Sequence, residues 1–290
     1  MKDDVGMSVG RFRIRGRWVG VTRIRGLVLR RMMRRPFNER AWAPDRRRIV
    51  ALGDSHLEVI PRYVAPRVTA MFDIVQVWGA TAQGLVNPNS STDALRLFQA
   101  RLDRAPRWQT VLLELGEVDC GFVIWYRAEK KGLTVDDQLE VSLGNYLGFI
   151  DRQVASGFDV WVMSAPLPTI GDAQDWGEVA NLRRMVGATQ SERTALTLRY
   201  NQLLQQACLA RRVRFIDVSS EQLDLATGII KPEFVHSDRL NHHLDDSSWG
   251  DLIVRELISL PESELADSRL APAVCRRRSG KPRNAVASAR

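Results

Sequence analysis

The chain has 290 residues, 44% of them hydrophobic, so it is long enough to bury the core of one large domain or two small ones. The formal net charge of +8 is unevenly placed: residues 1–48 carry 15 Lys/Arg against 4 Asp/Glu, and residues 271–290 carry six basic residues and no acid. The segment between these ends is net acidic, which argues against a nucleic-acid-binding protein.

Cysteine usage and hydropathy predict a cytoplasmic protein without a metal or another cofactor. The three cysteines show no metal-binding spacing and no even set for disulfides, which fits a reducing compartment. No apolar stretch reaches the roughly 18 residues that a membrane span needs. Arginines interrupt every candidate apolar core of an N-terminal signal peptide.

The two ends of the chain are expected to lie outside the folded domain. Residues 1–47 mix basic with apolar side chains, and such an arm is either solvated and partly ordered or lies on an anionic membrane surface. In the second case the protein would be peripheral to the inner membrane face. Residues 263–290 are expected to form a disordered basic tail, because the basic stretch at residues 276–284 lacks apolar side chains. The folded domain is then predicted to span residues 48–262.

Between these ends, short apolar segments alternate with helical patterns. Strands are expected at residues 49–52, 73–78, 110–115, 158–163 and 213–218. Helices are expected at residues 91–103, 136–156, 192–211 and 246–259. This alternation predicts an α/β fold, a three-layer αβα sandwich around a five-stranded, mainly parallel, flavodoxin-like sheet.

Polar segments follow several of these strands, at the edge where open α/β sheets form their sites. The segments are residues 53–56, 79–84, 116–121 and, after the fifth strand and a connection, 236–244. All four histidines of the chain fall in the first or the last segment. We therefore expect the four segments to form one polar site.

Ser55 lies where the first strand is expected to give way to a helix. Gly53 permits a sharp exit from the strand, and the free N–H groups at a helix start favour a developing negative charge. Ser55 is therefore placed like a nucleophile. The alternative is that Asp54 or Ser55 only caps the helix.

The four segments, in their order and rough spacing, resemble the motif blocks of the SGNH (GDSL-type) hydrolases. The Gly-Asp-Ser-His opening is similar to that of a bacterial variant subgroup of this superfamily. The resemblance covers about residues 48–258 and implies an SGNH-hydrolase fold. It also implies a carboxylic ester hydrolase that acts on a small-molecule or glycan ester through Ser55.

The last segment would supply the base. The resemblance implies that His243 or His242 takes the serine proton and that Asp238 orients the imidazole. The spacing departs from the Asp-x-x-His pattern of the family, because the third residue after Asp238 is Asn241 and the histidines follow it. The site is thus either a triad with a local insertion or a Ser–His dyad.

The second and third segments would stabilise the oxyanion. The resemblance implies that the Ser55 N–H and that of Gly79 or Gly84 act as donors. Val118 occupies the position where the family has an oxyanion-binding Asn. The remaining oxyanion and substrate-binding candidates are Asp54, His56, Gly116 and Glu117.

The departures from the family pattern leave two functions open. The first is the serine hydrolase just described. The second is a catalytically impaired binding or accessory protein that docks on a membrane or polyanion through its basic ends. A metal site could in principle be formed by Glu117, Asp119 and His56. The sequence holds no His-x-x-x-His or similar spacing, so no metal is expected.

Overall fold

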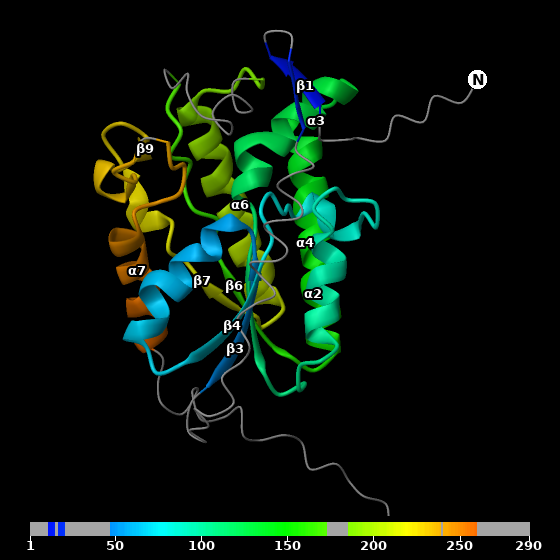
Figure 1. The fold of residues 1–290 in the computed structure, drawn as a ribbon, viewed down its shortest axis with the longest axis vertical. Coiled ribbons are helices and arrows are strands. Elements are labelled where there is room, and N and C mark those ends of the chain that lie inside the picture. Colours follow the sequence, from blue (N-terminus) through cyan, green and yellow to red (C-terminus); the bar gives the residue numbers. More distant parts are fainter. Residues whose placement is uncertain (1–10, 15–16, 21–46, 173–184, 239, 260–290) are drawn as a thin grey trace, which may run out of the picture.

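The computed structural model describes residues 11–14, 17–20, 47–172, 185–238 and 240–259 (Figure 1). Its centre is a five-stranded sheet in the order β4-β3-β5-β6-β7, and all neighbouring strands pair in parallel. The strands are β3 (Arg48–Gly53), β4 (Met71–Gln76), β5 (Thr110–Glu114), β6 (Asp159–Met163) and β7 (Arg214–Ile216). Each coincides with a predicted strand to within three residues, so the predicted α/β class is confirmed.

Five α-helices accompany the sheet in the described residues. They are α2 (Ala94–Leu102), α3 (Ile124–Lys131), α4 (Val135–Ala155), α6 (Gln190–Ala210) and α7 (Asp246–Ile258). Four were predicted, and α3 was not. Short helical turns lie at η1 (Ser55–Glu58), η2 (Ile60–Val64), η3 (Ala65–Arg67), η4 (Gln83–Val86), η5 (Asp119–Val123), η6 (Ser220–Gln222) and η7 (Pro232–Phe234).

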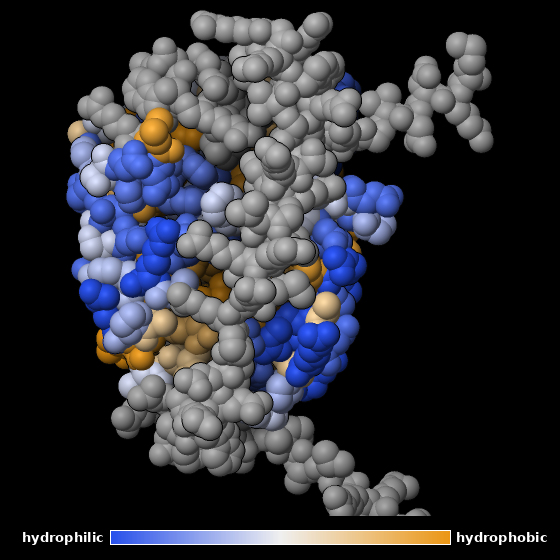
Figure 2. Space-filling view, in the orientation of Figure 1, coloured by the Kyte–Doolittle hydropathy of each residue, from blue (hydrophilic) through white to orange (hydrophobic). Residues whose placement is uncertain are grey.

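Apolar side chains cover both faces of the sheet, which makes the predicted three layers. On the interior strand β3, Val50 and Leu52 point to one face and join a buried cluster with side chains of α2, α4 and α6. Ile49 and Ala51 point to the other face and join a cluster with η2 and α7. In Figure 1 these two groups of helices lie on opposite sides of the sheet. On the face that Figure 2 shows, the surface of the described residues is mainly hydrophilic.

The starts of the two longest helices follow from their capping residues. Thr134 and Asp137 form a capping box at α4, and Thr189 and Glu192 form another at α6. Helix α6 therefore begins two residues before the predicted start, because Glu192 is its third residue and not its first.

Two small antiparallel pairs complete the described structure: β1 (Arg11–Ile14) with β2 (Arg17–Gly20), and β8 (Leu223–Asp224) with β9 (Ile229–Ile230). The rest of the predicted arm and the predicted tail lie outside the described residues, so the domain boundaries stay predictions. Within the described ranges, no helix has the length and apolar character to cross a membrane.

Candidate active site

The first segment leaves β3 through a position that only glycine fits. A Cβ on Gly53 would lie 2.4 Å from the backbone oxygen of Glu114 on the neighbouring strand β5. Asp54 then caps η1, because its Oδ1 accepts the backbone N–H of His56 at 2.8 Å. Ser55 follows as the first residue of η1, 6% exposed, and its carbonyl accepts a hydrogen bond from Gln76 at 2.7 Å.

The side chain of Asp54 also holds the ring of His56. Asp54 Oδ1 lies 2.9 Å from His56 Nδ1, and the two residues are 0% and 2% exposed. We assign a proton to Nδ1 of His56 because a carboxylate only accepts hydrogen bonds, and this N–H then donates a hydrogen bond to Asp54 Oδ1. The first segment thus contains both a helix cap and a buried carboxylate–imidazole pair.

Three histidine rings from the first and last segments converge. The ring of His56 lies edge-on to His243, with centroids 4.9 Å apart, and to His242, with centroids 6.2 Å apart. The rings of His242 and His243 are 4.3 Å apart. The buried ring of Trp249, on α7, lies 6.0 Å from that of His56. These contacts bring the first and last segments together, as expected from the sequence.

His243 is held as a neutral imidazole. Its Nε2 is buried and has no hydrogen-bond partner. Burial and the neighbouring His56 and His242 lower the pKa of His243 to about 2, while the carboxylate of Glu117 acts in the opposite direction. The neutral ring leaves its Nε2 as an acceptor, while the lowered pKa makes protonation of this nitrogen unfavourable.

The last segment is anchored at both of its ends. Val235 and Leu244 form an antiparallel bridge, and the N–H of Asp245 donates to the carbonyl of Phe234 at 2.9 Å. Asp245 also caps α7 by accepting the N–H groups of Ser247 and Ser248.

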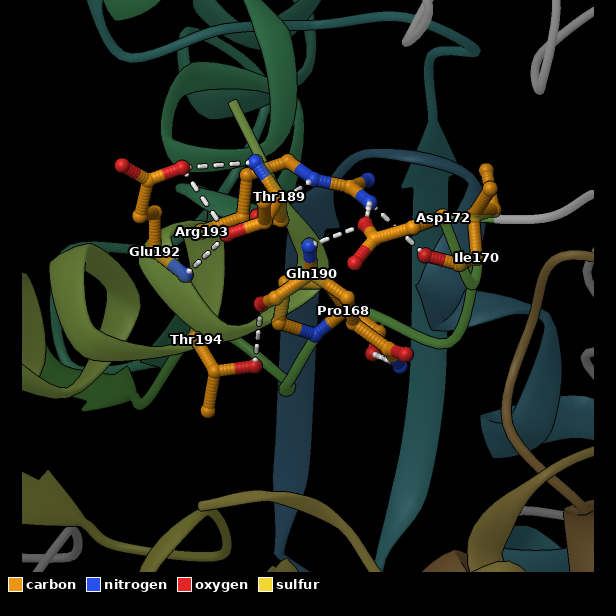
Figure 3. A network of polar contacts seen from close by, with 8 residues as sticks. All are labelled: Pro168, Ile170, Asp172, Thr189, Gln190, Glu192, Arg193 and Thr194. Carbon is orange, nitrogen blue, oxygen red and sulfur yellow. Dashed lines mark hydrogen bonds and ion pairs between the residues drawn. The ribbon is translucent and has the colours of Figure 1, made fainter. Parts of the chain in front are cut away.

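The loop after β6 supports the last segment from a third side. Thr169 donates its hydroxyl to the carbonyl of His242 at 2.5 Å. Figure 3 shows how the start of α6 holds this loop: Gln190 donates to the carbonyl of Pro168 at 2.9 Å, and Arg193 donates to that of Ile170 at 2.8 Å. The position of His242 therefore depends on the start of α6.

Asp238 does not take the orienting position that the resemblance implied. Its side chain is exposed, and its Oδ1 accepts the N–H of Leu240 at 2.9 Å. Its own N–H donates to Nδ1 of His236, also at 2.9 Å, and its carbonyl accepts the N–H of Asn241. Asp238 thus belongs to a surface turn with His236, and the carboxylate that bonds a site histidine is Asp54.

The third segment begins with a second position that requires glycine. Gly116 has a φ of 136°, and a Cβ there would lie 2.7 Å from Tyr200 Cε1 and 2.9 Å from Ala165 Cβ. Glu117 follows and is 6% exposed, and its carboxylate partly opposes the lowering of the His243 pKa. The half-buried Val118 offers no side-chain donor.

Asp119 ties the third segment to the second. Its buried carboxylate accepts the N–H groups of Ala82 and Gln83, at 2.7 and 3.0 Å, and the hydroxyl of Ser142 at 2.8 Å. Burial raises the pKa of Asp119 to about 6, against these hydrogen bonds. Asp119 is thus a structural link, and the described residues contain no cluster of three or more ligand side chains arranged for a metal.

The two glycines of the second segment differ in their backbone contacts. The N–H of Gly84 already donates to the carbonyl and hydroxyl oxygens of Thr81, at 3.1 and 2.9 Å. Gly79 is exposed, with a φ of 71°, directly after Trp78. Of the two oxyanion donors predicted from sequence, Gly79 is the one that remains compatible with this role.

Glu114, the last residue of β5, is not among the site residues predicted from the sequence. It is 0% exposed, and both of its carboxylate oxygens are buried without a hydrogen-bond partner. Its signal in the sequence was a single acid within the apolar run Thr110–Leu115, which was interpreted only as strand.

The sequence matches no protein-family model and no curated protein. Solved structures do match. A candidate acylhydrolase from Bacteroides fragilis NCTC 9343 superposes with a TM-score of 0.51 at 13% identity, over 81% of this chain and 94% of that one. A GDSL-like lipase from Bacteroides thetaiotaomicron VPI-5482 gives 0.47 at 15% identity, over 84% and 97%. An acetyl xylan esterase gives 0.44 at 12% identity, over 73% and 98%.

The match at a TM-score of 0.51 confirms the predicted α/β fold, which the chain shares with that candidate acylhydrolase. Membership of the SGNH (GDSL-type) hydrolase superfamily is what the sequence resemblance implies. Its assignment to the Gly-Asp-Ser-His subgroup stays a prediction.

Proposed function

We propose that the protein hydrolyses carboxylic esters, with Ser55 as the nucleophile and His243 as the general base. The observation that supports the proposal is the convergence of the rings of His242 and His243 on that of His56, the residue that directly follows Ser55 in η1. In an SGNH-hydrolase fold, this is the edge of the sheet where the carboxyl ends of the strands form a site.

The reaction would follow the acyl-enzyme route. His243 Nε2 takes the proton of Ser55 Oγ as this oxygen bonds to the ester carbonyl carbon. The Ser55 and Gly79 N–H groups face the resulting oxyanion. His243 then gives its proton to the leaving alkoxide, the C–O bond breaks, and an acyl group stays on Ser55. A water molecule, activated by the same imidazole, releases the acid and restores the serine.

Charge around His243 sets the efficiency of this route. The reaction makes an imidazolium, which burial and the two neighbouring histidines disfavour and the carboxylate of Glu117 favours. The valine at position 118 removes one oxyanion donor, a loss of about 2.7–4 kcal/mol of transition-state stabilisation in comparable sites. We therefore expect slow turnover of simple esters. The proposed substrate is a small-molecule or glycan ester, as the sequence resemblance implies.

Covalent labelling tests the nucleophile directly. The purified full chain is treated with a fluorophosphonate probe and assayed with p-nitrophenyl acetate, next to Ser55→Ala and Ser156→Ala. Ser156 is an exposed serine at the end of α4, so its variant is a matched control. Labelling and turnover that vanish only in Ser55→Ala support the proposal. Labelling that persists in Ser55→Ala, or no labelling and no turnover in the wild type, overturns it.

A second candidate function is a non-catalytic accessory protein that docks on an anionic surface through its basic ends. Val118 in the third segment and the exposed turn around Asp238 favour this candidate, because both depart from the family's machinery. It would place the protein in the cytoplasm, peripheral to the inner membrane face. It predicts salt-sensitive binding to phosphatidylglycerol vesicles that is lost when residues 1–47 are deleted. Binding that survives the deletion would contradict it.

A further inference from the structure

Two buried carboxyl groups lie at the ends of neighbouring strands: Asp54 directly follows β3, and Glu114 is the last residue of β5. Gly53 pairs with Glu114 in the parallel register of β3 and β5, so Asp54, the next residue, stands beside the end of β5. Asp54 Oδ1 is occupied by the two N–H groups of His56, but its Oδ2 is buried without a hydrogen-bond partner. Both carboxylate oxygens of Glu114 are likewise buried without a hydrogen-bond partner.

A single proton would satisfy both groups. Two ionised carboxylates without partners are very costly in an apolar interior, whereas a carboxylic acid beside a carboxylate supplies one donor and one acceptor. Burial, the charge of Asp54 and the charge of Glu117 all raise the pKa of Glu114 well above its ordinary value. Asp54 Oδ1 already accepts the backbone N–H of His56, so Asp54 Oδ2 is the oxygen left to accept a proton that Glu114 donates.

We propose that Glu114 is a neutral acid that donates its proton to Asp54 Oδ2, so that Glu114, Asp54 and His56 form a buried chain that orients the ring of His243. The part that concerns His243 rests on the proposed function, whereas the chain itself does not. With its proton on Nδ1, His56 keeps a basic Nε2, and its ring lies edge-on to His243. Glu114 and Asp54 are then positioning residues, and the first segment supplies the orienting acid that Asp238 does not.

The protonation state of Glu114 can be read by infrared spectroscopy. At neutral pH in D2O, the wild type and Ser55→Ala should both show the C=O stretch of a buried carboxylic acid, and Glu114→Gln should lack it. Gln keeps the size of Glu and an N–H donor toward Asp54, so this variant is expected to fold. Absence of the band in the wild type, or its persistence in Glu114→Gln, overturns the proposal.

The orientation of His56 can be read from imidazole ¹⁵N shifts in the Ser55→Ala background. His56 should be protonated on Nδ1, and Glu114→Gln should leave that tautomer unchanged. Glu114→Met removes the donor and should give a mixture of tautomers. Leu113→Met, a buried substitution on the same strand, is the matched control and should behave like the parent. A His56 protonated on Nε2 in the parent overturns the chain.

Kinetics separate the chain from the proposed function. In the background with Ser55, Glu114→Gln should keep kcat within about twofold, and Glu114→Met should lower kcat about tenfold with KM unchanged. An infrared band and an Nδ1 tautomer without any esterase activity would leave the chain standing and remove the proposed function. Esterase activity without the infrared band would remove the chain and leave the proposed function standing. If Glu114→Met does not fold, the band and the Glu114→Gln variant still decide.

Discussion

The carboxylate of Asp54 accepts both the backbone N–H and the ring N–H of His56, at 2.8 and 2.9 Å. Ser55 lies between these two residues, so its backbone is closed within a short ring of hydrogen bonds at the end of β3. In the proposed reaction, a serine held in this way would lose little conformational freedom on attack, which is the contribution that preorganisation makes to catalysis. The same carboxylate fixes the tautomer of the ring that meets His243.

The two histidines of the last segment are expected to differ in their effect on turnover. His243→Gln removes the ring with the unpartnered buried nitrogen and should lower kcat on p-nitrophenyl acetate by about 10³-fold or more. His242→Gln should lower it less than about tenfold, since this ring lies further from His56. His236→Gln, in the exposed turn, is the control and should act like the wild type. The reverse order of the first two variants would make His242 the base.

Asp238 is expected to be dispensable for catalysis. Asp238→Asn keeps the oxygen that accepts the Leu240 N–H and removes only the charge of an exposed turn. We expect a change in kcat of less than about threefold, whereas loss of a triad carboxylate lowers kcat by about 10⁴-fold in serine proteases. The measurement is the initial rate on p-nitrophenyl acetate at saturating substrate. A loss above about a hundredfold would return Asp238 to the orienting role.

Asp119 should make the protein less stable as the pH rises. Its pKa is 3.8 in the unfolded chain and about 6 in the folded protein, so between these values the folded state binds more protons. Stability from this group is fully present below about pH 3.8 and is lost as the pH rises through about 6, on the order of 3 kcal/mol.

Urea unfolding of the wild type and Asp119→Asn over about pH 4 to 7 tests this sign. The wild type should exceed the variant in stability most at the acid end, and the difference should shrink as the pH rises. Other titrating groups, His243 among them, are common to both proteins and cancel in the difference. A difference that stays constant or grows with pH would contradict the assignment.

Gly116→Ala should destabilise the fold by about 1–3 kcal/mol, because its left-handed backbone and the contact with Tyr200 both exclude a Cβ. Gly144→Ala is the control, since no atom lies within 4 Å of a Cβ at this position of α4. It should be neutral or add up to about 1 kcal/mol. Both values come from urea denaturation midpoints at a common m-value. Equal effects of the two substitutions would contradict the packing argument.

The fold was predictable from sequence because hydrophobic periodicity reports which residues face the core. The five apolar segments and four helical patterns translate directly into strands and helices. Helix α3 was missed, because it follows η5 without a break and its eight residues carry a run of charged side chains. The three-layer arrangement then followed from strands that are buried on both faces.

The site was predictable only in part. The order of polar segments after strands identified Ser55 and the histidine pair, because carboxyl ends of parallel strands meet at one edge. The meeting of Asp54 with Glu114 depends on β3 and β5 being neighbours in the sheet, although β4 lies between them in the sequence. The local turn that takes Asp238 away from the histidines depends on hydrogen bonds two residues apart, which residue spacing alone does not reveal.

Folding of the domain also exchanges protons between the protein and the solvent. Near pH 5, the raised pKa values of Glu114 and Asp119 favour proton uptake on folding, and the lowered pKa of His243 favours release. Folding therefore shifts protons toward two buried acids, Glu114 and Asp119, and away from the buried imidazole of His243.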